Sequence, residues 1–380
     1  MRFKHAPALC AFALLASASR TAHAGGGAAT DAYDGIRDDV ALDVHGLADL
    51  YVQENLGAAA SRAPQLRAFD MHAGAPAIGL VHVALAHKPD VVGFRVDVGV
   101  GDMANSYLHY DPASASHPDF SRGMSYVEQA FVTAIVPVGR GFTLDVGKFG
   151  TPVGLEENES LTNWNYSRSL LYLIAEPSYH AGARLTYPVL RTLALSAFWV
   201  NGWDATIFDG NGMRAGAAAV TWNPSDKTEI VVDYMGGLER APTRLFDPAQ
   251  TFRHELDFYA TYDLTDRISF ASTADYGRDA ASGGVSWWGV AGYLRVRALP
   301  WLAGTLRGEH LADTNGFTTG TKQRLAEATA TIETREQVGR VTMIQRLEYR
   351  RDRSDTRVFE SLAAPLTRQD TVTAALIAAF

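Results

Sequence analysis

Two pairs of adjacent residues are the first candidates for catalysis. His254-Glu255 and Glu309-His310 each place an imidazole beside a carboxylate, the groups that general acid–base chemistry uses. Both pairs lie in segments where apolar and polar residues alternate, so both are expected in β-strands. Because neighbours in a strand point to opposite faces, the members of a pair cannot share one substrate directly. The sequence therefore assembles no convergent catalytic cluster.

Two further motifs could bind a metal or a nucleotide. His109, Asp111 and His117 lie in one short stretch, but their spacing matches no established metal-ligand pattern. Gly99-Val100-Gly101 lacks the third glycine and the following helix that a nucleotide-binding loop needs. We therefore predict no catalytic residue, no metal and no cofactor.

Charged side chains recur on one face of the alternating segments. In 91–102, Arg95 and Asp97 point one way, while the apolar residues at alternate positions point the other. Burying such charges in a packed core is costly, whereas a hydrated interior removes that cost. A soluble β-sandwich with a solvated face gives the same alternation, so alternation alone does not decide the fold. The charges expected on polar faces are Asp43, Arg95, Asp97, Asp145, Arg184, Glu229, Asp233, Arg253, Asp257, Arg295, Arg307, Glu309, Glu327, Arg346 and Glu348.

The order of strands and connections separates the two folds. Sixteen alternating segments are expected, near 42–53, 76–88, 91–103, 124–138, 142–150, 179–189, 192–202, 213–223, 227–236, 252–262, 267–277, 286–298, 301–311, 322–334, 338–350 and 368–380. Short turns, such as 87–90, 138–141, 223–226 and 298–300, alternate strictly with long stretches such as 54–75, 104–123, 151–178, 237–251 and 351–367. Bacterial barrels alternate short periplasmic turns and long outer loops in this way. We predict an all-β fold, a transmembrane antiparallel up-and-down β-barrel of about 16 strands.

The N-terminal end indicates export. A basic start precedes an apolar run at 8–16, and Ala22-His23-Ala24 offers a cleavage site, as in a secretory signal peptide. A membrane anchor is the competing interpretation, but the run is shorter than the roughly 20 residues of a spanning helix. We predict a signal peptide at 1–24 and an outer-membrane β-barrel at 25–380, with strands from about residue 42.

Removal of the signal peptide changes the composition in two ways. The only cysteine, Cys10, leaves with it, so the mature chain has no disulfide. The remaining 31 basic and 42 acidic side chains give a net charge of −11, which argues against a nucleic-acid partner.

The last predicted strand ends on an aromatic residue. Val372, Ala374, Leu376 and Ala378 share an apolar face with Phe380. A C-terminal strand ending in phenylalanine looks like the segment that barrel-assembly machinery reads, so Phe380 is the predicted assembly signal. An edge strand that ends in phenylalanine by chance is the alternative.

Aromatic residues gather near strand ends. Such positions suit girdles at the membrane interface, where an amphipathic ring lies at headgroup level. The predicted girdle residues are Tyr51, Tyr107, Trp199, Trp222, Tyr234, Tyr262, Tyr276, Trp287, Trp288 and Trp301. Alternation places Lys148 on the same lipid-facing side as Phe142, Leu144 and Val146, where a charge is unfavourable. We therefore expect Lys148 at the junction of strand and loop, where either the alternation ends or its long side chain reaches water.

Several motifs between residues 40 and 205 resemble one known family. They are 147–154 (GKFGTPVG), 163–171 (NWNYSRSLL), 179–184 (YHAGAR) and 200–204 (VNGWD), with 65–70 (QLRAFD) and 92–97 (VGFRVD) upstream. In order and spacing they resemble the putative β-barrel porin-2 (OmpL-like) family of Gram-negative bacteria. The resemblance implies an outer-membrane porin and no catalytic residue. Glu176-Pro177-Ser178 replaces a more hydrophobic stretch of the family, so the pore lining is expected to differ there.

The segment 151–178 is the predicted constriction. Its apolar residues would form a large exposed patch in water, so we expect it to fold into the barrel, with packing over the mouth or against a neighbouring subunit as the alternative. Opposed charges across a narrow passage would then select ions. The predicted constriction residues are Glu156, Glu157, Glu159, Trp164, Tyr166 and Arg168, and the predicted pore lining is Arg95, Asp97, Asp145, Arg184, Arg253 and Asp257.

These observations predict a porin that lets small hydrophilic solutes or ions diffuse through a water-filled barrel. The alternatives are an outer-membrane enzyme of protease or lipase type and a plugged barrel for adhesion or structure. The expected partners are membrane lipids and lipopolysaccharide, the barrel-assembly machinery and the solutes themselves. A homotrimer and a monomer both fit the sequence.

Overall fold

The structure is a computed structural model that describes residues 42–57, 63–207, 213–239, 250–361 and 364–380. The predicted signal peptide, 1–24, lies outside these ranges. Within them, no helix is both long enough and apolar enough to cross a membrane.

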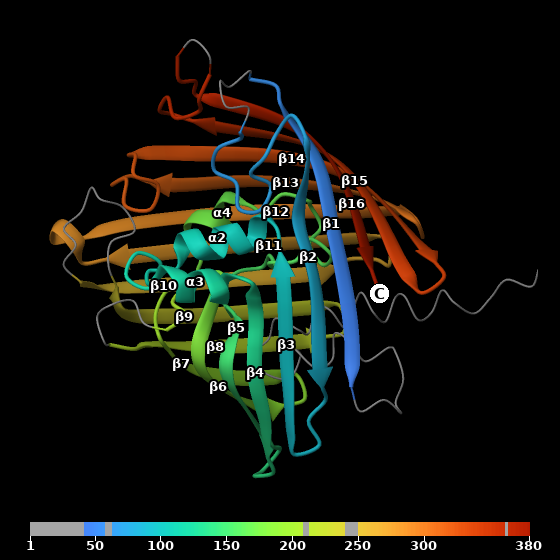
Figure 1. Ribbon diagram of the computed structural model, residues 1–380, viewed down its shortest axis with the longest axis vertical. Helices are drawn as coiled ribbons and strands as arrows, with labels where there is room; N and C mark the ends of the chain where they lie inside the picture. Colours follow the sequence, from blue (N-terminus) through green and yellow to red (C-terminus); the bar gives the residue numbers. More distant parts are fainter. Residues whose placement is uncertain (1–41, 58–62, 208–212, 240–249, 362–363) are drawn as a thin grey trace, which may run out of the picture.

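The described residues form sixteen strands, each antiparallel to its neighbours, and pairing of β1 with β16 closes them into a barrel (Figure 1). The strands are β1 (Asp43–Asn55), β2 (Pro76–His87), β3 (Val92–Val100), β4 (Val127–Val136), β5 (Phe142–Gly150), β6 (Tyr179–Leu190), β7 (Leu193–Val200), β8 (Ala215–Ser225), β9 (Thr228–Glu239), β10 (Thr251–Asp263), β11 (Ile268–Asp279), β12 (Val285–Leu299), β13 (Leu302–Asp313), β14 (Gln323–Val338), β15 (Val341–Ser354) and β16 (Arg368–Ala379). The predicted fold class is confirmed, and each predicted strand overlaps an observed one.

The two faces of the wall have opposite character. On β3, Val92 and Val98 are exposed on the outside, whereas Arg95 and Asp97 are buried on the inside. Side chains that alternate with period 2 produce this division along every strand. An apolar outer face and a polar inner face are what a barrel in a lipid bilayer requires.

The outer face carries most of the predicted aromatic girdle. Trp199, Trp222, Tyr234, Tyr262, Tyr276, Trp288 and Trp301 are exposed. The prediction was wrong for Tyr51, Tyr107 and Trp287, which are buried. Tyr51 and Trp287 occupy inward positions of their strands, and Trp287 stacks on Phe317 with the ring centroids 5.3 Å apart. Tyr107 belongs to a helix rather than to a strand.

The connections differ at the two ends of the barrel. At the end with long loops, the segment after β3 forms α2 (Asp102–Tyr110) and α3 (Pro118–Ser125), and the segment after β5 contains α4 (Leu170–Ile174). The alternation of short and long connections is not strict, because β11 and β12 are joined at this end by the brief turn η2 (Ala281–Gly283).

At the end of β5, side chains no longer follow the alternation set by the first residues of the strand. Lys148 is buried rather than facing lipid, and its ammonium donates to the carbonyls of Met124 (3.1 Å) and Val127 (2.7 Å). The preceding Gly147 has φ +145, a backbone conformation that other residues rarely adopt. The alternation therefore ends at the junction with the loop, which was one of the two expected outcomes.

Candidate functional site

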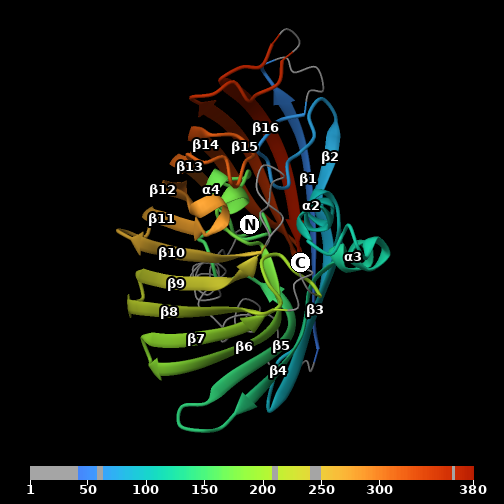
Figure 2. The same ribbon diagram turned by 90° about the vertical axis from the view of Figure 1, so that its left-hand side faces the viewer.

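Residues 151–178 connect β5 to β6 and are named the inner loop below. The loop lies within the ring of strands, where α4 packs beside β12 and β13 (Figure 2). Leu170 and Leu171 are fully buried in a cluster that includes Trp287 and Leu311 of the wall. The apolar side chains of this loop are thus covered, which removes the cost of exposing them to water.

Arg346 of β15 binds the main chain of the inner loop. Its guanidinium donates to the carbonyl oxygens of Ser160 (2.6 Å), Asn163 (2.6 Å) and Asn165 (3.2 Å). The same group forms an ion pair with Glu333 of β14 at 2.7 Å. The rigid, planar guanidinium can serve these acceptors together, which a lysine could not do with one point charge.

Arg307 of β13 provides a second attachment. It donates to the carbonyl of Ser167 at 2.7 Å and forms ion pairs with Glu156 of the loop at 2.8 Å and Glu327 of the wall at 2.9 Å. The other oxygen of Glu156 accepts the amide of Ser169 at 2.6 Å. The predicted constriction residue Glu156 therefore contacts both the wall and its own loop.

Two wall carboxylates bind loop amides. Glu309 accepts the amides of Leu170 (2.8 Å) and Leu171 (2.6 Å) at the start of α4. Glu348 accepts two consecutive amides, those of residues 166–167, at 2.6 and 3.0 Å. The first amides of a helix lack partners within the helix, so the Glu309 carboxylate satisfies them.

Asp49 of β1 also binds the loop. Asp49 accepts the hydroxyl of Ser160 at 2.6 Å and the hydroxyl of Tyr166 at 3.0 Å. The rings of Tyr51 and Tyr166 lie 5.8 Å apart. The inner loop is therefore attached to one arc of the wall, β1 and β13–β15, in which only β16 lies between β1 and β15.

Arg168 stabilises the loop itself. Its guanidinium donates to the carbonyls of Glu157 (3.3 Å), Asn158 and Tyr166 (2.9 Å), and it lies 5.0 Å above the ring of Phe69. These contacts fold the loop back on itself and hold it against the segment that follows β1.

The remaining predicted constriction residues lie along the same loop. The half-buried ring of Trp164 meets Tyr293 of β12 edge to face, with the centroids 6.4 Å apart. The amide of Glu157 donates to the side chain of Asn163 at 2.8 Å. Glu159 lies beside His82 of β2, the strand next to β1.

The six residues predicted to line the pore all lie on the inner face and have polar partners there. Arg95 pairs with Asp97 (2.8 Å), Asp145 with Arg184 (2.8 Å) and Arg253 with Asp279 (3.2 Å), while Asp257 accepts the amide of Gly154 (3.2 Å). The catalytic candidates divide as expected, since Glu255 and Glu309 are buried inside whereas His254 faces outward. These contacts form a charged inner wall to which the inner loop is bound.

The model of the family described as "Putative beta-barrel porin-2, OmpL-like" matches residues 41–380. The chain belongs to this porin family. It is thus an outer-membrane porin with a channel through its barrel.

Solved outer-membrane porins share the fold of this porin. The channel DcaP of Acinetobacter baumannii has 10% identity and a TM-score of 0.60, with 89% of this chain and 97% of that chain covered. The anion-selective porin from Comamonas acidovorans has 9% identity and a TM-score of 0.58, with 89% and 99% covered. OmpF of Salmonella typhi, in complex with daunomycin, has 11% identity and a TM-score of 0.56, with 89% and 97% covered. No curated protein sequence matches the porin.

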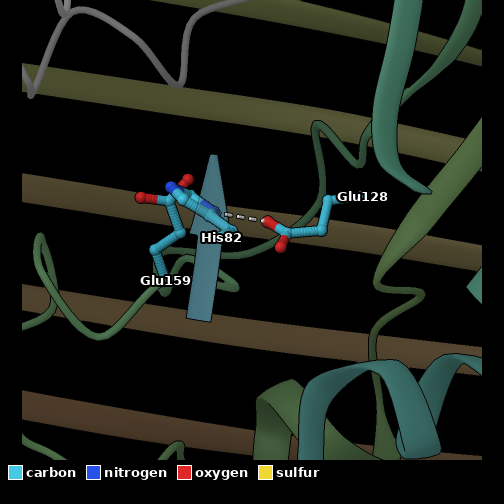
Figure 3. Close-up of side chains that lie close together, drawn as sticks. All are labelled: His82, Glu128 and Glu159. Atoms are coloured by element: carbon cyan, nitrogen blue, oxygen red, sulfur yellow. Dashed lines mark hydrogen bonds and ion pairs between the residues drawn. The ribbon is translucent and has the colours of Figure 1, made fainter. Parts of the chain in front are cut away.

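Three ionisable side chains link the inner loop of the porin to β2 and β4 (Figure 3). The Nδ1 atom of His82 lies 2.9 Å from the Glu128 carboxylate, and Glu159 approaches the other side of the imidazole. Burial raises the pKa of Glu159 to about 7, an effect that the charge of His82 opposes and that of Glu128 adds to. The three groups each place a ligand atom within 4.8 Å of the others, close enough to hold a metal ion.

The raised pKa of Glu159 predicts a pH-dependent loop. The bound loop holds this proton more tightly than a free loop, whose glutamate has a pKa of about 4.5. Attachment is therefore favoured below about pH 4.5 and weakens as the pH rises to about 7. We expect conductance to increase between pH 5 and pH 8 in planar bilayers, and Glu159→Gln to reduce that increase. An unchanged pH profile in Glu159→Gln, with Glu336→Gln as the exposed control, would contradict this.

Some attachment residues were not predicted as site residues. Arg307, Glu309, Arg346 and Glu348 were expected on inward faces, but the sequence did not connect them with the loop. Asp49 lies on the polar face of the first predicted strand, so alternation could have placed it inside as well. What was missing was the pairing, because each contact joins residues far apart in the chain.

Proposed function

We propose that this porin passes small hydrophilic solutes or ions by passive diffusion, and that the inner loop sets the narrowest part of the passage. The observation that supports the proposal is the attachment of the loop to both β1 and β13–β15. A barrel of this size encloses an aqueous channel unless something folds into it. A loop held inside the barrel by several wall strands occupies part of that interior and leaves a smaller cross-section.

We propose a mild preference for cations. Before α4, the loop carries Glu156, Glu157 and Glu159 against Arg168, an acidic excess near the passage. The pairing of Glu156 with Arg307 neutralises part of this excess, which leaves Glu157 and Glu159 as the residues for selectivity. Rings of acidic side chains favour cations in channels.

Planar-bilayer recording across a KCl gradient tests both the passive diffusion and the preference for cations. The purified porin is expected to give stepwise conductance, with a reversal potential of the sign that cation selectivity produces. Replacing Glu157 and Glu159 together by glutamine should shift the reversal potential towards anions with little loss of folded protein. The control is Glu336→Gln, which removes one exposed carboxylate at the end of β14 near the short turn to β15. A protein that folds but conducts nothing would contradict the porin proposal, and a reversal potential unchanged by the double variant would remove these residues from selectivity.

We further propose export by a signal peptide at 1–24 and insertion by the barrel-assembly machinery, with lipids and lipopolysaccharide around the finished barrel. We also propose assembly as a homotrimer. A solved OmpT of Vibrio cholerae with the same fold, 10% identical with a TM-score of 0.58, is described as a trimer form. The proposed activity is transport rather than catalysis, in keeping with the family to which the chain belongs.

A further inference from the structure

A row of aspartates crosses three adjacent strands inside the barrel. Asp257 of β10 lies directly opposite Asp233 of β9 on one side and Asp275 of β11 on the other. All three carboxylates point inward and are buried, with at most 3% of each residue exposed. Like charges directly opposite each other destabilise a sheet, so this row needs a neutralising partner.

The inner loop adds a fourth carboxylate to the row. One oxygen each from Glu176, Asp257 and Asp275 lies within 4.8 Å of the others. Gly154, at the other end of the loop, has φ +94, and a Cβ atom there would overlap the Glu176 carboxylate. Its amide donates to Asp257 at 3.2 Å. Both ends of the loop therefore meet the wall at Asp257, and glycine is needed for Glu176 to approach.

Several oxygens of this group have no hydrogen-bond donor among the described residues. They are both carboxylate oxygens of Asp233, both of Asp275 and one of Glu176, and all are buried. An ionised carboxylate taken out of water without a partner is strongly unfavourable. Asp233 is not one of the three closest ligands, but its buried carboxylate lies directly opposite Asp257 in the same row, and neither of its oxygens has a hydrogen-bond donor among the described residues.

The other half of the inner wall is arranged differently. Glu327 pairs with Arg307 at 2.9 Å, Glu333 with Arg346 at 2.7 Å, and Asp352 with the Arg350 guanidinium at 2.9 Å. These acids of β14 and β15 therefore have an arginine beside them. The aspartate row on β9–β11 lacks this compensation, and its buried oxygens face one another.

Glu176 is surrounded by other acidic side chains. Glu176 is buried, and the acidic groups of Asp257, Glu156, Glu255 and Glu309 lie close enough to repel its charge. Carboxylates this close repel one another when no positive group lies between them. A bound cation would offset that repulsion, because it stabilises the ionised form of each ligand.

We propose that Glu176, Asp257 and Asp275, with Asp233 beside them, bind a hard divalent cation of the Ca²⁺ type that fastens both ends of the inner loop to β9–β11. Carboxylate oxygens are the ligands that Ca²⁺ prefers, and Ca²⁺ tolerates irregular geometry, whereas Mg²⁺ requires a near-ideal octahedron. The site holds the base of the loop, whereas the arginines of β13 and β15 hold its middle. Cation binding does not depend on conduction, so the two proposals can fail separately.

Terbium luminescence offers a direct test. Tb³⁺ substitutes for Ca²⁺ at oxygen sites, and Tyr259 follows Asp257 on the same inward face of β10, where it can sensitise a bound Tb³⁺ ion. The full-length folded porin in detergent would be stripped with EDTA and titrated with Tb³⁺, then with Ca²⁺ as competitor. We expect one saturable class of sites that Ca²⁺ displaces.

The matched variants decide whether the signal comes from the aspartate row. Asp257→Asn with Asp275→Asn should weaken Tb³⁺ binding by about tenfold or more, because affinity follows the charge of the ligand set. Asp266→Asn removes an exposed carboxylate in the turn of the same hairpin and should bind like the unaltered protein. If the double variant does not fold, as judged by heat-modifiable migration, Glu176→Gln tests the same site without changing a strand.

Two results would overturn the proposal. The first is no saturable, Ca²⁺-competed signal in the unaltered protein, in which case the carboxylates share protons. The second is equal Tb³⁺ affinity in the unaltered protein and in the folded double variant or Glu176→Gln. Conductance of the EDTA-treated porin, recorded in parallel, shows whether the channel proposal stands when the cation proposal fails.

Discussion

Replacing both Arg307 and Arg346 with alanine should release the inner loop and raise the single-channel conductance. Arg346 binds three loop carbonyls, and Arg307 binds both a loop carbonyl and the Glu156 carboxylate. Removing one partner of a buried charge pair costs about 3–5 kcal/mol. Since 1.4 kcal/mol is about a tenfold change in an equilibrium, loss of either arginine alone should shift loop attachment by roughly a hundredfold to several thousandfold.

Recording in planar bilayers measures this effect, with heat-modifiable migration as the check that the barrel has folded. The matched control is alanine at Arg267 and Arg340, two exposed arginines in the short turns. The control should conduct like the unaltered porin. If the Arg307 and Arg346 variant folds and conducts like the control, the inner loop does not narrow the passage.

Phe380→Asp should sharply lower the amount of folded barrel in the outer membrane. The amide of Phe380 donates to the Gly46 carbonyl at 3.0 Å, and its carbonyl accepts the Gly46 amide at 3.1 Å, across the β1–β16 seam. Its ring covers Gly46, where a Cβ atom would overlap ring atoms. A charge near the membrane interface costs at most about 1 kcal/mol. Because this cost is too small to unfold the barrel, we expect the loss to occur during insertion.

Comparison of folding in cells with folding in detergent separates assembly from stability. Phe380→Asp should refold in detergent with nearly normal yield but be depleted from the outer membrane. Phe380→Tyr keeps the ring and serves as the control for both measurements. A normal folded yield in cells, or an equal loss in detergent, would count against an assembly signal.

The sequence alone determined the strands of the barrel wall and which of their side chains face inward. Alternation is a local property, because successive side chains of a strand point to opposite faces whatever the strand pairs with. It therefore placed Arg95, Asp97 and Asp257 on the inner face, and the spacing of turns predicted sixteen strands. Where a local irregularity breaks the period, as after Gly147, the same argument stops working, and the end of β5 could not be assigned to one face.

The tertiary structure decided which inward groups meet. Arg307 and Ser167 are 140 positions apart, and their contact depends on the path of the inner loop through the barrel. The aspartate row exists because the register of β9, β10 and β11 puts Asp233, Asp257 and Asp275 side by side, and alternation does not specify register. The sequence identified Glu156 as a charged loop residue, but its pairing with Arg307 required both the loop and the wall. The direction of a side chain follows from its neighbours in the strand, whereas its partners depend on how the barrel closes around the inner loop.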